Sequence, residues 1–336
     1  KLTHVQRLAP RGESLCLCAL QNQSSSFKTN VGNIMIRKLI TIALFYLCSL
    51  NVYGSSIESL KADINTLLES KKATVGVSIY GSNGEHMLSI NGDTRIPMQS
   101  VFKYHLAVAT LHQVDQGRWS LEDKITITPE DLDNGLWSPI RKKYPKGVKL
   151  TLSEVIKYTV AVSDNVGCDI LIRMLGGPKV IEKYFHQSGI TNIAIKYDEE
   201  TMQEVWERQY ENWTTANAAN IALSKFLKNN SQILTSDSHQ FLWDVMKSSK
   251  TGRKTIRAGV PKGTVVAHKT GHSGKNDTGM TAAQNDIGVV FLPDGSIYYL
   301  SILVSDSLET PEINKKIISD ISNLAWKFFK KNNSAE

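Results

Sequence analysis

The 336-residue chain is poor in cysteine and proline, and it has no run of about 20 apolar residues that would span a membrane. Its four cysteines exclude a disulfide-rich scaffold. Nine prolines and 22 glycines exclude a collagen-like or linker-type composition. The residues that are present, 41% apolar and 21% charged over this length, are typical of a globular protein with two lobes.

The chain also lacks the patterns that mark nucleic-acid, nucleotide and metal sites. The net charge of +7 comes largely from six basic residues before position 55, where Glu13 is the only acid, so the remaining chain is nearly neutral. A near-neutral body lacks the clustered positive field of a nucleic-acid-binding protein. We find no Walker or Rossmann glycine pattern and no zinc-ligand spacing. We therefore expect no nucleic-acid partner, no metal and no cofactor.

The first 54 residues have the features of a targeting segment. Residues 35–54 begin with Met-Ile-Arg-Lys, continue with an apolar run of about a dozen residues and end in small residues, as secretory signal peptides do. We expect cleavage after Gly54 and a secreted, periplasmic protein, and we assign no role to residues 1–34. Attachment of a lipid at Cys48 is the alternative. The mature chain keeps only Cys168, so no internal disulfide is expected.

The mature chain is predicted to have strands near both ends and helices between them. A helix over residues 56–70 and a final helix over 312–331 accompany five predicted strands, at 74–80, 85–90, 264–268, 286–292 and 296–305. We predict an α+β fold in which both chain ends build one antiparallel sheet flanked by helices. Residues 55–99 and 251–336 would form this α/β lobe, and residues 100–250 an inserted all-helical lobe.

Ser100 and Lys103 have a spacing that suits chemistry at the start of a helix. Residues i and i+3 share a helix face, so the hydroxyl and the amine lie close together. A serine hydroxyl becomes a useful nucleophile when a neighbouring base takes its proton. The backbone N–H groups of a helix start favour developing negative charge. This motif alone is weak, because most Ser-x-x-Lys matches in proteins are structural.

Two further short motifs lie at predicted element boundaries. Ser163 and Asn165, in Ser-Asp-Asn at a break between two helices, offer a proton carrier and an amide donor, although a helix cap explains the same residues. Lys269, Thr270 and Gly271 end a predicted strand and supply a positive charge, a hydroxyl and room for close backbone approach. The alternative is an edge strand with a solvated lysine.

The ordered set of motifs is far more specific than its members. Ser-x-x-Lys, Ser-Asp-Asn and Lys-Thr-Gly follow one another in this order, separated by about 60 and then about 100 residues, as in class A β-lactamases and penicillin-binding proteins. Over residues 56–333 the chain resembles the serine β-lactamase and DD-peptidase superfamily. This resemblance implies that Ser100 is acylated and that Ser163 and Lys103 relay the proton to the leaving nitrogen. It also implies an oxyanion site between the N–H groups of Ser100 and His272.

A loop between the second and third motifs distinguishes the two enzyme types. Class A β-lactamases carry there a glutamate that activates the deacylating water. Alignment of the loop's end, Asn212-Trp213-Thr214, implies that Glu199 is this base and that Gln203 is the second ligand of the water. Glu200 is the alternative base if the alignment shifts by one residue, and solvated loop acids are a third possibility.

Several details resemble the PER and CfxA branch of class A. Gln99 precedes the nucleophile, His268 precedes Lys269, and Tyr-x-Asn-Trp-Thr closes the loop. Tyr197 and Asn212 stand where most class A enzymes have an Arg–Asp pair, so that salt bridge is not expected here. The arginine that meets the substrate carboxylate in many relatives is matched most closely by Thr255, with Arg253 and Arg257 nearby, and we leave that role unassigned.

The resemblance implies a monomeric serine β-lactamase that hydrolyses its substrate through an acyl-enzyme and needs no metal. The branch favours cephalosporins as substrates. A DD-peptidase and a β-lactam sensor remain the alternatives, because both use the same three motifs but stay acylated. Glu199 argues against the first, and the short apolar leader argues against the second.

Overall fold

The computed structural model describes residues 57–230 and 232–332. The predicted signal peptide, its cleavage site and Cys48 lie outside these residues. None of the helices in the described ranges combines the length and apolar character that a membrane span requires.

The centre of the described chain is a five-stranded antiparallel sheet with the order β2-β1-β10-β9-β8. Both ends of the described chain contribute strands, because Thr74 of β1 pairs with Ser305 of β10. The prediction of an antiparallel sheet built from both ends is confirmed. The strands are β1 (Thr74–Tyr80), β2 (His86–Ile90), β8 (Val266–His272), β9 (Thr281–Phe291) and β10 (Ile297–Ser307).

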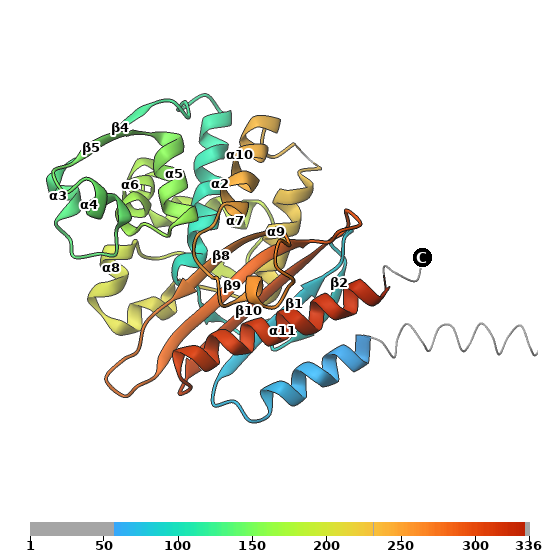
Figure 1. Cartoon of the computed structure of the whole chain (residues 1–336). Coiled ribbons are helices and arrows are strands. Elements are labelled where there is room, and N and C mark those ends of the chain that lie inside the picture. Colours follow the sequence, from blue (N-terminus) through green and yellow to red (C-terminus); the bar gives the residue numbers. More distant parts are fainter. Residues whose placement is uncertain (1–56, 231, 333–336) are drawn as a thin grey trace, which may run out of the picture. The chain divides into compact units, whose positions relative to one another are not determined.

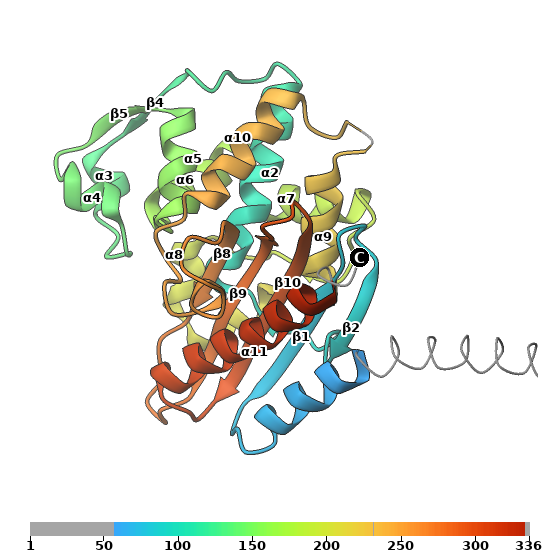
Figure 2. The same cartoon turned by 45° about the vertical axis from the view of Figure 1, so that its right-hand side comes forward.

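Helices cover both faces of this sheet. The helix over residues 57–68 and the long α11 (Pro311–Asn332) pack on one face, which is the near face in Figures 1 and 2. Their apolar core includes a stacked pair, Tyr298 and Phe329, with ring centroids 4.4 Å apart. The opposite face packs against α2 (Phe102–Asp115), α9 (Ala216–Lys228) and α10 (Ser236–Lys247), which share a second core. Burial on both faces explains why the central strands are almost continuously apolar.

The segment 100–250 is mainly helical, but it is not helical throughout. Its remaining helices are α3 (Pro129–Leu132), α4 (Pro139–Lys143), α5 (Leu152–Ala161), α6 (Asn165–Leu175), α7 (Pro178–Gln187) and α8 (Glu199–Glu204). A hairpin of β4 (Lys124–Ile127) and β5 (Val148–Thr151) was not expected, nor was a small sheet of β3 (Ile96–Pro97), β7 (Trp213–Thr214) and β6 (Ile193–Ala194). These strands are too short for period-2 alternation to show in the sequence.

Local sequence signals explain where several helices begin and end. The predicted capping box is present at α5, where the Thr151 side chain accepts from the Glu154 N–H and the Glu154 carboxylate accepts from the Thr151 N–H. Asp164 caps α6 through the Gly167 N–H, and the helix ends at Gly176 in the left-handed region. The break between α5 and α6 is where the sequence placed the Ser-Asp-Asn motif.

A buried amide holds the turn before α2 against the sheet. The Asn285 side chain on β9 donates to the carbonyl oxygens of Pro97 (2.7 Å) and Met98 (3.2 Å), and it accepts from the N–H of Val304. The side chain is fully buried, so no water replaces these partners. Asn285 therefore fixes the position from which the chain enters α2.

Replacement of Asn285 by alanine is expected to destabilise the fold by about 1–3 kcal/mol, because buried carbonyls lose their donor. Urea unfolding at neutral pH measures this loss. The Gln240→Ala variant is the control, since its amide bonds Asp244 at an exposed position and should cost less than about 0.5 kcal/mol. Equal losses in the two variants would contradict the tethering role.

Candidate active site

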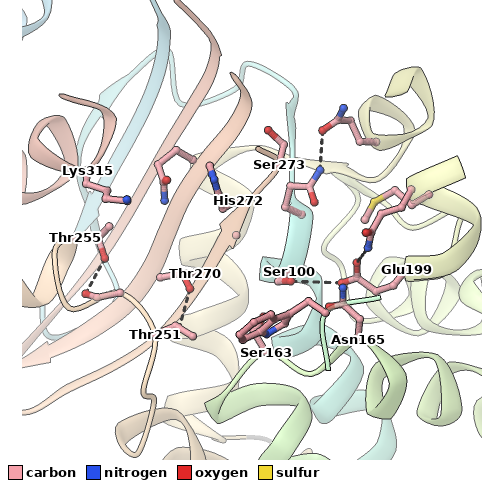
Figure 3. Close-up of a pocket in the computed structure, with 18 of the residues that line it drawn as sticks. Ser100, Ser163, Asn165, Glu199, Thr251, Thr255, Thr270, His272, Ser273 and Lys315 are labelled. Atoms are coloured by element: carbon pink, nitrogen blue, oxygen red, sulfur yellow. Dashed lines mark hydrogen bonds between the residues drawn. The ribbon is translucent and has the colours of Figure 1, made fainter. Parts of the chain in front are cut away.

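A cavity of about 720 Å³ lies where α2, α6, α8 and β8 approach one another. Figure 3 shows Ser100 between Glu199 on one side and Thr270 on the other. Most of the residues predicted for the site line this cavity, namely Ser100, Ser163, Asn165, Glu199, Gln203, Thr270, Gly271 and His272. The two predicted lysines, Lys103 and Lys269, are buried directly behind the cavity wall.

Ser100 lies in a 3-10 turn, η1 (Gln99–Val101), that leads into α2. Gln99 has a φ of 48°, a left-handed conformation that is rare for a residue with a side chain. Lys103 lies one helical turn after Ser100, and its Nζ donates to the Ser100 Oγ at 2.8 Å. The structure thus brings the first predicted pair into the contact that its spacing indicated.

Glu199 faces the same serine from α8. Its Oε1 lies 2.7 Å from the Lys103 Nζ and accepts from the Ser100 Oγ at 3.4 Å, and its Oε2 accepts from the Gln203 Nε2 at 3.0 Å. The Glu199 side chain is only 2% exposed, whereas Glu200 is exposed to solvent. Of the two acids that the alignment left open, only Glu199 reaches the nucleophile.

Asp169 positions Glu199, and the sequence analysis did not single it out. Its carboxylate accepts from the backbone N–H of Glu199 at 2.8 Å and of Glu200 at 3.0 Å, which are two free donors at the start of α8. Asp169 follows Asn165 by four residues on α6, so both side chains lie on the helix face that meets α8. This spacing is the sequence signal that could have revealed Asp169.

Burial and neighbouring charges shift several pKa values in this cluster. Burial acts to lower the pKa of Lys103, but the Glu199 carboxylate and other nearby acidic groups outweigh it and raise the pKa. Lys103 is therefore held as a cation paired with Glu199. Burial and the charge of Glu199 raise the pKa of Asp169 to about 8. Lys103, Glu199 and Asp169 therefore form one electrostatic cluster beside Ser100.

Ser163 and Lys269 meet on the other side of Ser100. Ser163 lies between α5 and α6 with a φ of 61°, and its Oγ accepts from the Lys269 Nζ at 3.0 Å. The Ser163 carbonyl accepts from Lys103 at 3.3 Å, so the serine contacts both lysines. Burial and the charge of Lys103 lower the pKa of Lys269 to about 7. The charge held on Lys103 thus disfavours a charge on Lys269.

Asn165 and Asp164 use their side chains differently. The carbonyl oxygen of Asn165 accepts from Lys103, so its amide nitrogen is left as a donor toward the cavity. Asp164 points away from the cavity, and its carboxylate accepts from Ser138 and from the N–H groups of Ile140 and Gly167. The middle residue of the motif is therefore a fixed structural support.

The sequence analysis expected the strand to end at His268. In the structure, the third motif lies inside β8. Strand β8 runs on to His272 because β9 pairs with it up to Gln284. A Cβ on Gly271 would lie 2.4 Å from the Met98 carbonyl and 3.0 Å from the Gln99 Cβ. The space beside Gly271 is therefore occupied by the turn that carries the nucleophile. The His272 side chain is exposed at the end of the strand.

Positions 197 and 212 of the loop that carries Glu199 are joined through an amide and not through an ion pair. Asn212 accepts from the N–H groups of Lys196 and Tyr197 and donates to the Tyr197 carbonyl. Tyr197 donates its hydroxyl to Glu211. The expected absence of an Arg–Asp salt bridge between positions 197 and 212 follows from the residues, and these neutral contacts replace it. The loop also contains the short helix α8, at which Glu199 is the first residue.

The candidates for the unassigned carboxylate role are separated by the structure. Thr255 is buried, and Arg257 donates to the carbonyls of Ser249 and Lys247. Arg253 lines the cavity, with two cations that the sequence analysis did not consider, Lys254 and Lys315 of α11. Other lining residues that it missed are Trp137, Met202, Trp206, Gln209, Thr251, Gly252, Ser273 and Gln284. These residues come from distant segments, and no local motif marks them.

Within the described ranges, no group of three or more His, Cys, Asp or Glu side chains is arranged to hold a metal ion. The cavity provides a hydroxyl nucleophile, an amine and a carboxylate beside it, and a cationic end.

Comparisons with known proteins agree with this arrangement. The profile of the Beta-lactamase enzyme family matches residues 59–329. Over 295 residues, 88% of this chain and 98% of the relative, the sequence is 40% identical to β-lactamase VEB-1 of Pseudomonas aeruginosa. It is 37% identical to the extended-spectrum β-lactamase PER-1 of the same organism over 90% of this chain and 98% of the relative.

A solved structure extends the comparison to the fold. A class A β-lactamase from Bacteroides cellulosilyticus superposes with a TM-score of 0.79 at 31% identity, covering 82% of this chain and 99% of that chain. The chain therefore belongs to the class A serine β-lactamases, in their PER branch, and is an enzyme that hydrolyses β-lactams.

Proposed function

We propose that this enzyme hydrolyses the β-lactam amide through an acyl-enzyme on Ser100, with Glu199 as the base for deacylation. The observation that carries the proposal is that the Ser100 Oγ lies within 2.8 Å of the Lys103 Nζ and 3.4 Å of the Glu199 Oε1. A hydroxyl between two such groups can lose its proton as it attacks a carbonyl carbon.

In the acylation step, Ser100 attacks the ring carbonyl. Its proton passes to Glu199 through a water, or to Lys103 after Lys103 has given its own proton to Glu199, which lies 2.7 Å away. Both routes remain open, as they do for the family. We assign the oxyanion to the backbone N–H groups of Ser100 and His272. One such donor typically contributes ~10²–10³ in rate.

Opening of the ring requires a proton for the leaving nitrogen. The Ser163 hydroxyl accepts from Lys269 at 3.0 Å, and its carbonyl accepts from Lys103. Ser163 can thus deliver its proton to the nitrogen and be reprotonated from the lysines. The left-handed φ of 61° supports a positioned hydroxyl, because such a conformation persists only where its surroundings hold it.

Deacylation needs a water on the side of the ester that faces α8. Glu199 would take a proton from this water while Gln203, which already donates to the carboxylate, helps to hold it. Asp169 fixes the backbone from which Glu199 extends. The base is therefore positioned from three elements, α2, α6 and α8.

The substrate carboxylate would bind at the opposite end of the cavity. The hydroxyls of Thr270 and Thr251 lie 2.8 Å apart there, near the buried Lys269. Arg253 and Lys315 add positive charge at the cavity edge. Asn165, with its free amide nitrogen, would bind the side-chain amide of the substrate. Similarity to an extended-spectrum relative supports cephalosporins as substrates.

Other parts of the proposal rest on sequence pattern alone. Residues 35–54 are proposed to act as a signal peptide that directs the enzyme to the periplasm, with residues 1–34 upstream of it. The division into an α/β lobe (55–99 and 251–336) and a helical lobe (100–250) stays a prediction. So do a monomeric state and the absence of cofactors and nucleic-acid partners.

The Glu199→Gln variant is expected to acylate with a cephalosporin and then stall. Without the Glu199 carboxylate, burial lowers the pKa of Lys103, so the neutral amine can act as the base for acylation. Turnover should fall by ~10²–10⁴, and intact mass spectrometry should find a long-lived adduct. Glu200→Gln is the matched control and should keep nearly normal turnover, since its side chain is exposed. The reverse result would move the base by one residue, and normal turnover in both variants would refute the mechanism.

The Asp169→Asn variant is expected to slow deacylation by about tenfold, because the amide has one acceptor oxygen for two N–H donors. Rapid-quench measurement of the adduct separates this step from acylation, which should change less. Asp198→Asn provides the control: Asp198 caps α8 through Thr201, and asparagine is an equally good cap. If acylation slowed as much as deacylation, Asp169 would not act through Glu199.

The rate constant kcat/KM is expected to fall as pH rises through about 7, because Lys269 then loses the charge that attracts the carboxylate. Lysine is charged below its pKa, so the loss lies on the alkaline side. In Lys269→Arg the alkaline limb should move to higher pH, since arginine stays charged. A limb that remained at the same pH in this variant would assign it to another group.

A further inference from the structure

A buried hydrogen-bonded pair behind the third motif takes no part in the mechanism above. His268 of β8 and Asp286 of β9 are both fully buried, and the His268 Nδ1 lies 3.0 Å from each carboxylate oxygen of Asp286. Neither residue lines the cavity. A buried carboxylate is unfavourable unless hydrogen-bond partners satisfy it, so Asp286 depends on the groups that contact it.

The same carboxylate binds a second segment. Its Oδ2 accepts from the Thr255 hydroxyl at 2.6 Å and from the Ile256 N–H at 3.1 Å. One carboxylate therefore joins β8, which carries Lys269 and Thr270, to the segment 251–256. We call this segment the 251–256 wall, because five of its residues line the cavity.

The wall is fitted closely to the strand. Gly252 has a φ of +68°, and a Cβ there would lie 2.6 Å from the His268 Cε1 and 2.7 Å from the Thr270 Cγ2. The His268 ring is thus the surface against which the wall rests. At the other end of the wall, the Thr270 hydroxyl donates to Thr251 at 2.8 Å, a contact drawn in Figure 3. The distance between wall and strand is fixed at three points.

We propose that His268 and Asp286 are positioning residues that set how the cavity binds the anionic end of the β-lactam. They act by holding the 251–256 wall at the separation from Thr270 that a carboxylate between Thr251 and Thr270 requires. This inference rests on the proposed binding of the substrate carboxylate at that end. Deacylation, which takes place toward α8, should not depend on the pair.

The test compares His268→Ala with wild type on a cephalosporin and on its carboxylate methyl ester. For the acid, kcat/KM should fall about tenfold, as for one lost charge-assisted hydrogen bond, while the rate for the ester stays within about twofold. Decay of the preformed acyl-enzyme should also stay unchanged. His268→Asn should recover most of the loss, because its amide can donate from near the Nδ1 position.

Ser301→Ala is the matched control for a purely structural effect. Ser301 lies on β10 of the same sheet and does not line the cavity. It donates to the buried Asn220 side chain of α9 at 2.7 Å. Both substrates should therefore react with Ser301→Ala as they do with wild type. If His268→Ala fails to fold, Thr255→Val carries the test, since it removes the wall's own hydroxyl bond to Asp286. The same selective loss for the acid is expected.

Amide hydrogen exchange gives a readout that needs no turnover. Peptides that cover residues 251–256 should exchange faster in His268→Ala and Asp286→Ala, because the Ile256 N–H loses its ordered acceptor. Equal losses for acid and ester, or unchanged exchange in the wall, would overturn the positioning role. Failure of the wild-type protein to hydrolyse either substrate would instead refute the proposed function.

Discussion

The site depends on one buried ion pair, between Lys103 and Glu199. The two groups lie 2.7 Å apart with side chains 0% and 2% exposed. Charges this deep are tolerated only when each remaining donor and acceptor has a partner. Ser100, Asn165 and Gln203 supply those partners. Because the contributors come from α2, α6 and α8, the pair also decides how these three helices meet. Removal of either charge would leave the other uncompensated at the centre of the enzyme.

The loop that carries Glu199 shows how such a charge can be positioned although residues 197 and 212 form no ion pair. Asn212 ties the loop through neutral bonds to Lys196 and Tyr197. Asp169 then accepts from the N–H groups of Glu199 and Glu200 at the start of α8, beside the N-cap Asp198. Since the pKa of Asp169 is raised to about 8 beside Glu199, loop geometry and the charge of the base are linked. The Asn212 amide carries no charge, so its bonds to the loop add no charge to the interaction between Asp169 and Glu199.

Local motifs predicted the parts of the site that are local in space. Ser100 and Lys103 meet because three residues make one helical turn, and the antiparallel α+β fold followed from strands near both ends. Alignment placed Glu199, although only side-chain direction separates it from Glu200. The sequence could not reveal that Asp286 meets Thr255, or that Gly271 faces Met98, because these contacts join segments whose distance is set by the sheet. Short strands such as β4 and β6 were missed because two to four residues carry no periodicity.

The pairing of β1 with β10 has a consequence for how the protein reaches its folded state. Thr74 and Ser305 are neighbours in the sheet but belong to opposite ends of the chain. During synthesis, α2 and Ser100 leave the ribosome long before β8, β9 and β10 have been made. Until then, β1 has no β10 with which to pair. Contacts of such high sequence separation make folding slow, because a long loop must close first. The complete sheet, and with it the placement of β8 beside the nucleophile, therefore forms only after residue 307 has been made.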